Sequence, residues 1–274
     1  MKNKILYIVA LLLMLGCWRV TMADNNELKT IKSIPDEKWQ KLSQKKIYFG
    51  HQSVGDNIML GINELMVSNP SIKLQINKTN DPNDFRHPVF AHKDIGNNSD
   101  TNSKISAFRD DMQKGIGNRA DIAFLKFCFW DIRSSTDIKT VFNGYKSTLA
   151  ELKSRFPRTK FVHMTIPLME YPNGVKDRIY RFFNMSNSSD LDNMRRNELN
   201  ELILNEYRAK EPVFDIAMVE STLPDGKRAF FSKDGKTYYY LARDYTNDGG
   251  HLNVEGRKRV AEQLLVFLAE IAEK

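Results

Sequence analysis

The stretch Lys46–Ile58, KIYFGHQSVGDNI, decides the fold of this chain. It opens with a short β-type run that ends at Gly50, and a helical pattern begins after Gly55. Ser53 therefore stands in a tight turn between a strand and a helix, where α/β proteins bind ligands. A serine there can expose its hydroxyl beside the positive end of the next helix, which suits attack on a carbonyl. Capping that helix is the alternative role of Ser53.

Strand-like and helix-like segments alternate along the rest of the chain, which predicts a parallel sheet with helices on both faces. We expect one domain over residues 24–274. Residues 81–100, rich in Asn, Asp and Pro, are expected to form a long loop, and 222–247 a long insertion. The expected strands are 46–49, 73–77, 121–130, 160–166 and 213–216. The expected helices are 35–42, 58–66, 103–112, 138–156, 191–210 and 254–273.

The composition is that of an ordinary globular protein, with 41% hydrophobic and 27% charged residues among 274. The formal net charge is +7, but the charges are interspersed and form no block of lysine and arginine. We therefore expect no nucleic-acid partner.

The first 23 residues have the pattern of a secretory signal peptide. Lys2 and Lys4 precede an apolar core, Ile5–Leu15, which is too short to cross a membrane. Small residues at Thr21 and Ala23 favour cleavage before the next residue. The mature chain is expected to be exported to the periplasm or the extracellular space, with no transmembrane span.

A lipoprotein leader over residues 1–16 is the alternative, because Met14–Cys17 resembles a lipoprotein box with a lipid anchor at Cys17. Cleavage after Ala23 would instead leave Cys128 as the single cysteine. That count excludes an internal disulfide and a cysteine-based zinc cluster.

The second decisive stretch is Asp248–Gly256, DGGHLNVEG. Its Gly-rich turn places Asp248 and His251 just before the last helix. The turn can bring the carboxylate to one imidazole nitrogen, while the other nitrogen faces outward to take a proton from a serine. Ser53, His251 and Asp248 are therefore the predicted nucleophile, general base and orienting acid.

These two stretches resemble the SGNH (GDSL-type) hydrolase superfamily. Its final block carries Asp-x-x-His followed by Leu-Asn-x-x-Gly at the head of the last helix, and its nucleophilic serine follows the first strand. The resemblance implies a flavodoxin-like, three-layer α/β/α fold around a mostly parallel five-stranded sheet, and ester hydrolysis by a Ser-His-Asp triad. It also implies three oxyanion donors, namely the backbone amides of Ser53 and Gly96 and a side-chain amide. We expect no cofactor and no metal.

The sequence departs from the superfamily pattern at two places. The first block is usually Gly-Asp-Ser, whereas residues 50–53 read Gly-His-Gln-Ser. The third block usually supplies an asparagine, but Trp130 occupies that position. Asn98 or Gln52 could supply the missing amide, at a step where one lost donor costs about 2.7–4 kcal/mol. His51, Gln52 and Trp130 are the predicted substrate-binding residues, with hydrogen bonding to the turn as the alternative for His51.

Other side chains have structural interpretations beside functional ones. His87 and His92 are interpreted as solvated loop histidines because their surroundings show no metal-ligand spacing. His163 is expected to be a satisfied core residue, and Lys126, within an apolar strand, needs a partner such as a carboxylate. The tyrosines 238–240 either line a sugar-binding cleft or pack the insertion.

Taken together, these patterns predict an exported serine esterase that hydrolyses small-molecule or polysaccharide acyl esters, with acetyl groups as one expected class. An acyltransferase with the same triad is one alternative. A non-catalytic polysaccharide-binding or assembly protein is the other, and the tryptophan at position 130 is its main support.

Overall fold

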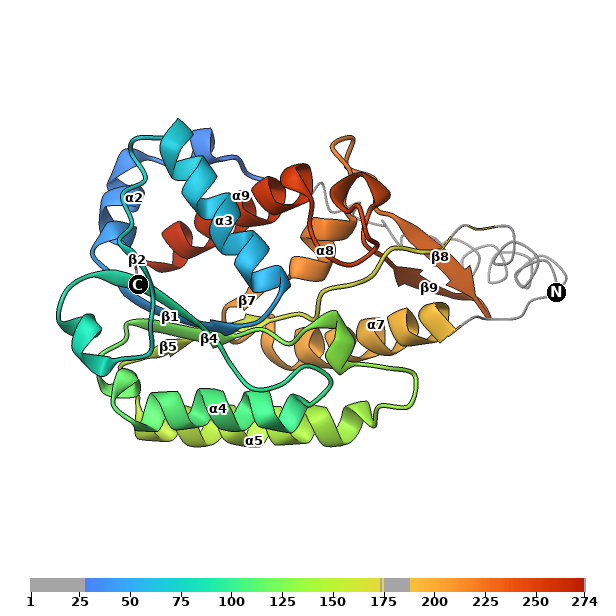
Figure 1. The fold of residues 1–274 in the computed structure, drawn as a ribbon, viewed down its shortest axis with the longest axis horizontal. Coiled ribbons are helices and arrows are strands. Elements are labelled where there is room, and N and C mark those ends of the chain that lie inside the picture. Colours follow the sequence, from blue (N-terminus) through green and yellow to red (C-terminus); the bar gives the residue numbers. More distant parts are fainter. Residues whose placement is uncertain (1–27, 173, 175–187, 274) are drawn as a thin grey trace, which may run out of the picture.

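A parallel five-stranded sheet in the order β2-β3-β1-β4-β5 lies at the centre of the computed structural model (Figure 1). The structure describes residues 28–172, 174 and 188–273, so the expected leader and the Cys17 anchor lie outside the described residues. Helices cover both faces of the sheet, which confirms the predicted three-layer α/β/α fold. The strands are β1 (Lys46–His51), β2 (Ile76–Lys78), β3 (Val89–Asp94), β4 (Ile122–Leu125) and β5 (Lys160–Phe161).

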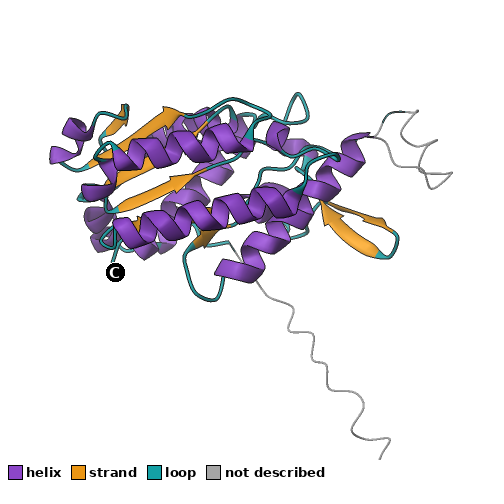
Figure 2. Cartoon of the chain, turned by 90° about the horizontal axis from the view of Figure 1, so that it is seen from below, coloured by secondary structure: helices purple, strands orange, loops and turns teal. Residues whose placement is uncertain are grey.

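Side chains of β1 alternate between two hydrophobic cores, as expected for a strand buried on both faces. Ile47 and Phe49 pack toward one helical layer, and Tyr48 packs toward the other. Figure 2 shows helices running along the strands. None of the helices in the described ranges has both the length and the apolar character needed to cross a membrane. The first layer contains α2 (Asp36–Ser43), α3 (Val54–Ser68), α8 (Ile216–Ser221) and α9 (Val254–Ile271), and the second contains α4 (Thr101–Gln113), α5 (Ile138–Arg155) and α7 (Ser188–Tyr207).

One central strand is absent from the sequence-based prediction. The expected loop 81–100 contains β3, which pairs with both β1 and β2. Its apolar run is only Val89–Ala91 amid polar residues, which is too short to indicate a strand by pattern. The register places His92 opposite Phe49, so this histidine lies in the sheet.

The predicted strand 160–166 is divided in two, and the last predicted strand pairs with its second part. β6 (His163–Met164) pairs with β7 (Val213–Phe214), outside the five-stranded sheet. The amide of Val162 still donates to the carbonyl of Ala123 at 3.0 Å, so the chain follows β4 up to the break. The sheet therefore has five strands as predicted, but their identity differs. It includes β3, which was not predicted, and it lacks the predicted strand 213–216.

The predicted insertion contains an antiparallel hairpin, β8 (Phe230–Lys233) and β9 (Lys236–Tyr239), which projects from one end of the molecule (Figures 1 and 2). The connections also contain short 3₁₀ helices: η1 (Ile31–Ser33), η2 (Pro82–Arg86), η3 (Ile116–Asn118), η4 (Phe129–Asp131) and η5 (Arg243–Tyr245).

The packing of α3 against α9 brings the two decisive stretches together (Figure 1). A Cβ atom on Gly61 would lie 2.5 Å from the backbone carbonyl oxygen of Arg257, so the two helices approach as closely as a glycine permits. Arg257 also pairs with Glu64 across the contact. The residue before α3 is Ser53 and α9 begins after Asn253, so this contact places the serine beside the histidine turn.

Glu220 in α8 is a buried carboxyl group that makes the stability of the fold depend on pH. It is 1% exposed, and it accepts a hydrogen bond from the backbone amide of Leu168. Burial raises the pKa of Glu220 to about 8. The folded protein therefore holds this proton more tightly than the unfolded chain, whose glutamate pKa is about 4.3. The contribution to stability is fully present below that pH and is lost as the pH rises toward 8.

Glu220→Gln is expected to remove this loss, because glutamine keeps the carbonyl acceptor and carries no charge. The free energy of unfolding of the variant, relative to the wild type, should rise by a few kcal/mol between about pH 5 and pH 8. Urea unfolding at several pH values in that window measures the difference. A difference that stays constant across the window would contradict the prediction.

Candidate active site

Ser53 lies in a strained turn between β1 and α3. Its backbone has φ 55° and ψ −104°, a region that residues with a side chain seldom adopt and that costs of order 1–3 kcal/mol. Ser53 is the N-cap residue of α3, but its side chain makes no capping hydrogen bond. The Oγ atom lies instead 2.6 Å from Nε2 of His251. The helix-capping alternative for this serine is therefore wrong.

The turn before α9 brings the other two predicted triad residues together. His251 Nδ1 lies 2.7 Å from Asp248 Oδ2. The second carboxylate oxygen, Oδ1, accepts hydrogen bonds from the backbone amides of Gly250 at 2.9 Å and His251 at 2.8 Å. The three predicted side chains thus form one continuous series, from the Ser53 hydroxyl through the imidazole to the carboxylate.

The environment of Asp248 keeps it ionised. Burial pushes the pKa of this carboxyl group upward, but the amides of Gly250 and His251 and the imidazole outweigh that effect and hold the pKa below its usual range. An ionised carboxylate accepts the Nδ1–H of the imidazole and leaves Nε2 free to accept the Ser53 hydroxyl proton. This is the tautomer that a general base needs.

Two contacts fix the position of the histidine turn. The ring of Phe129 packs edge-on against the His251 imidazole, with 5.5 Å between ring centroids. A Cβ on Gly250 would lie 2.7 Å from that phenyl ring, so only glycine fits there. The amide of Leu252 donates to the side chain of Asn57 in α3, which ties the turn to the helix after Ser53.

The predicted oxyanion donors lie in two adjoining turns. Neither the Ser53 nor the Gly96 backbone amide has an acceptor among the residues that the structure describes. Gln52 donates from Nε2 to the carbonyls of Ile95 and Gly96, which holds the two turns together. The amide nitrogen of Gln52 is thus engaged by backbone carbonyls, which favours Asn98 over Gln52 as the replacement for the missing oxyanion donor.

The loop that carries Gly96 rests on a buried ion pair that the sequence did not indicate. Lys104 Nζ lies 2.6 Å from Asp131 Oδ2, and both side chains are wholly buried. Lys104 also donates to Asn98 Oδ1 at 2.9 Å. Because a lysine can only donate, the oxygen of the Asn98 amide must face it, and the Nδ2 donor points away. Asn98 therefore keeps a free donor and remains the predicted third oxyanion group.

Asp131 completes this support from the turn after β4. It accepts hydrogen bonds from the backbone amides of Ser99 at 2.8 Å and Cys128 at 2.7 Å. One carboxylate thus joins the Gly96 loop to the turn that carries Trp130. The position of Lys104 on the apolar face of the helix expected at 103–112 could have indicated a buried lysine. The sequence contains no local signal for Asp131 as its partner.

The three predicted substrate-binding residues differ in their exposure and in their hydrogen bonding. His51 is fully buried and hydrogen-bonded to His92, so the prediction that its side chain contacts substrate is wrong. Gln52 is half-buried and its amide nitrogen is committed to the neighbouring loop. Trp130 is 37% exposed, with the guanidinium of Arg133 4.0 Å from the ring centroid. Substrate contact by Trp130 remains a prediction.

The structure also places the other histidines that the sequence singled out, and Lys126. His163 is buried and hydrogen-bonded, as predicted, and His87 is exposed. His92 is not a solvated loop residue, because it lies buried in β3. Lys126 donates to the carbonyl of Phe127 at 3.1 Å and makes no ion pair with a carboxylate in the described part of the chain.

The tyrosines at 238–240 differ in their surroundings, and sugar binding by them remains a prediction. Tyr238 is buried, and Tyr239 lies under the guanidinium of Arg228. Tyr240 stacks on Tyr171 and lines a cavity of about 590 Å³. The amide of Glu170, also in the lining, donates to the carbonyl of Gly249, so the cavity adjoins the turn that carries Asp248.

The layers, the sheet order and the placement of the serine after β1 agree with the three-layer fold that the resemblance to SGNH-type hydrolases implies. No family model matches the chain, and no curated protein sequence matches it either. Several solved structures are similar to it in fold. A Streptococcus pneumonia protein provisionally described as a platelet activating factor has 14% identity and a TM-score of 0.49, covering 96% of this chain and 99% of its own.

Two further structures are similar to this chain at comparable scores. A Desulfitobacterium hafniense protein, provisionally described as a lipolytic protein of the G-D-S-L family, has 11% identity and a TM-score of 0.47 over 81% of this chain and 99% of its own. A carbohydrate esterase of family 3 from Talaromyces cellulolyticus has 13% identity and a TM-score of 0.46 over 83% of this chain and 97% of its own. At these identities the likeness concerns the fold.

Proposed function

We propose that this protein is a serine esterase that cleaves acyl esters with Ser53 as nucleophile, His251 as general base and Asp248 as the orienting acid. One observation carries the proposal. A serine held at a strained φ of 55°, with no capping role, has its hydroxyl 2.6 Å from an imidazole whose other nitrogen lies 2.7 Å from a carboxylate. Backbone strain of this kind clusters at active sites.

In the proposed reaction, Ser53 Oγ attacks the ester carbonyl carbon while His251 Nε2 takes the hydroxyl proton. The carbonyl oxygen becomes an oxyanion that the backbone amides of Ser53 and Gly96 and the Nδ2 donor of Asn98 stabilise. His251 then passes its proton to the leaving alcohol oxygen, and the acyl group stays on Ser53. Water repeats the sequence, and the acid and the free serine are released.

We further propose that the substrate is an acyl ester of the acetyl class on a polysaccharide, met outside the cytoplasm after export. The side chains of His251 and Asp248 are 45% and 57% exposed, so the reacting group can be approached while attached to a large molecule. The cavity beside the turn offers the faces of Tyr171 and Tyr240, and aromatic faces stack on sugar rings.

Labelling by a fluorophosphonate probe tests the proposal directly. The probe reacts only with a serine activated by a base, so the wild type is expected to gain one adduct, located at Ser53 by mass spectrometry. Ser103, whose hydroxyl is engaged with the Asp100 carbonyl, is the matched serine that should stay unlabelled. A protein that remains unlabelled, yet binds glycan, would favour the non-catalytic alternative.

A further inference from the structure

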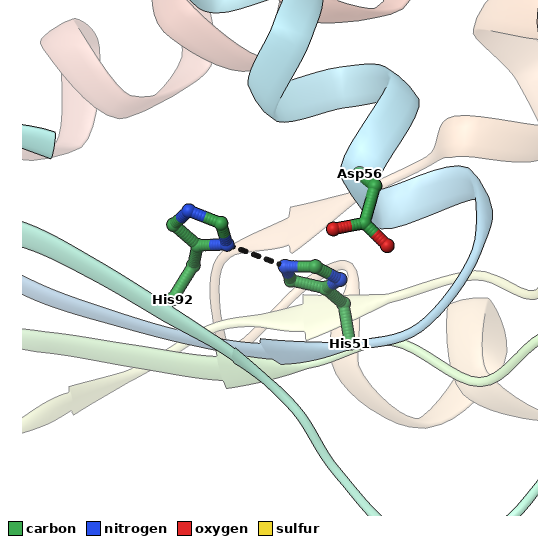
Figure 3. A group of neighbouring side chains, drawn as sticks. All are labelled: His51, Asp56 and His92. Atoms are coloured by element: carbon green, nitrogen blue, oxygen red, sulfur yellow. Dashed lines mark hydrogen bonds between the residues drawn. The ribbon is translucent and has the colours of Figure 1, made fainter. Parts of the chain in front are cut away.

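Beside the Ser53 turn, two histidines and an aspartate converge on one point between the sheet and α3 (Figure 3). His51 lies at the end of β1, His92 comes from β3, and Asp56 lies in the first turn of α3. One ligand atom from each lies within 4.8 Å of the others. Imidazole and carboxylate together form the donor set that divalent transition metals prefer in proteins.

The hydrogen bonding of the buried His51 ring is incomplete. Its side chain is 0% exposed, and Nε2 lies 2.8 Å from Nδ1 of His92. Nδ1 of His51 is buried and has no hydrogen-bond partner. The nearest carboxylate oxygen to that atom is Asp94 Oδ1, at 3.8 Å. A buried polar atom without a partner is uncommon and calls for an explanation.

We propose that His51, His92 and Asp56 bind a divalent transition metal of the zinc type. The metal takes the two nitrogens that face each other, His51 Nε2 and His92 Nδ1, and a carboxylate oxygen of Asp56. Ligation through Nε2 requires His51 to carry its proton on Nδ1. That N–H then faces Asp94 Oδ1 at 3.8 Å, and the carboxylate must approach it to become the outer partner that metal-bound histidines usually have. The site thus gives a role to the unpartnered nitrogen.

Metal binding requires the two rings to separate and the Asp56 carboxylate to move toward them, because the three ligand atoms lie up to 4.8 Å from one another. Two imidazole nitrogens on a tetrahedral zinc, with bonds of about 2.0–2.1 Å, lie roughly 3.3–3.4 Å apart. The facing nitrogens are 2.8 Å apart, so the two rings must separate by roughly half an ångström. The side chains of Asp56 and Asp94 are about half exposed, at 47% and 43%, which gives the ion a path from solvent.

Lys78 forms ion pairs with the two carboxylates of the cluster. Lys78 Nζ lies 3.3 Å from Asp56 Oδ1 and 2.6 Å from Asp94 Oδ2. Its side chain is 52% exposed, so its ion pairs are weak and the ammonium can move into solvent. Lys78 is therefore a competitor for the metal, and its position marks the cluster as a place that attracts a cation.

Zinc titration of the full chain, stripped with a chelator and followed by isothermal titration calorimetry, tests the site. One saturable zinc per chain is expected. Asp94→Asn should weaken binding by about 10–100-fold, as loss of an outer-shell partner does, and Asp56→Asn by at least as much. Lys78→Met should bind zinc more tightly, because the competing ammonium is gone. His87→Ala, which changes an exposed histidine elsewhere, should bind as the wild type does.

Asp56, Asp94 and Lys78 are exposed enough that their variants should fold, which thermal unfolding of the zinc-free proteins checks. Absence of saturable binding in the wild type would overturn the proposal. Binding that Asp56→Asn leaves unchanged, or that Lys78→Met weakens, would overturn the position of the ion. None of these readouts depends on ester hydrolysis, so failure here is distinct from failure of the proposed function.

Discussion

Ser53→Ala is expected to lower kcat for an acetyl ester by about five to six orders of magnitude, because the variant lacks the atom that forms the acyl-enzyme bond. Binding should change little, since the hydroxyl is a single small group of the site. The measurement is steady-state hydrolysis of p-nitrophenyl acetate by the purified chain. Hydrolysis that survives in Ser53→Ala would contradict the assignment of Ser53 as nucleophile.

Ser53→Gly separates catalysis from strain. Glycine adopts a φ of 55° without a steric penalty, so the variant should lose hydrolysis as fully as alanine does. Its free energy of unfolding should nevertheless be about 1 kcal/mol higher than that of Ser53→Ala. The relieved strain contributes this gain, and the greater flexibility of the unfolded glycine chain offsets part of it. Urea unfolding of the two variants side by side measures this. Equal stability of the alanine and glycine variants would mean that the turn stores no strain.

The parts of the site that sequence predicted are those with local signals. The strand that ends at Gly50 and the helix that follows Ser53 can be recognised within a dozen residues. The Gly-rich turn of Asp248 and His251 is also local. Their meeting across the molecule follows from the parallel topology, which brings the ends of strands to one edge.

The parts that sequence missed depend on pairings between distant segments. β3 was hidden because only three of its residues form an apolar run, and its burial comes from the strands on either side. His92 was therefore assigned to a loop, and its bond with His51, 41 residues earlier, was out of reach. The Lys104–Asp131 contact joins α4 to η4 across 27 residues, and no periodicity connects them.

Replacing either member of that ion pair is expected to have the largest effect on stability of any change beneath the Gly96 loop. Lys104→Met leaves the Asp131 carboxylate buried without its cation. Asp131→Leu leaves the Lys104 ammonium buried without its anion. Each should lower the free energy of unfolding by about 3–5 kcal/mol, since an uncompensated buried charge remains. Lys41→Met removes one partner of an exposed pair with Glu37 and should leave the free energy of unfolding almost unchanged, because solvent screens such pairs.

The double variant shows what the pair does beyond stability. Lys104→Met with Asp131→Leu leaves no buried charge, so much of the lost stability should return. The hydrogen bonds from Lys104 to Asn98 and from Ser99 to Asp131 are still missing, so the Gly96 loop loses two of its anchors. We therefore expect kcat to stay at least about tenfold below the wild type, with KM little changed, because the oxyanion donors act mainly in the transition state. A double variant with restored stability and wild-type kcat would show that the pair only stabilises the fold.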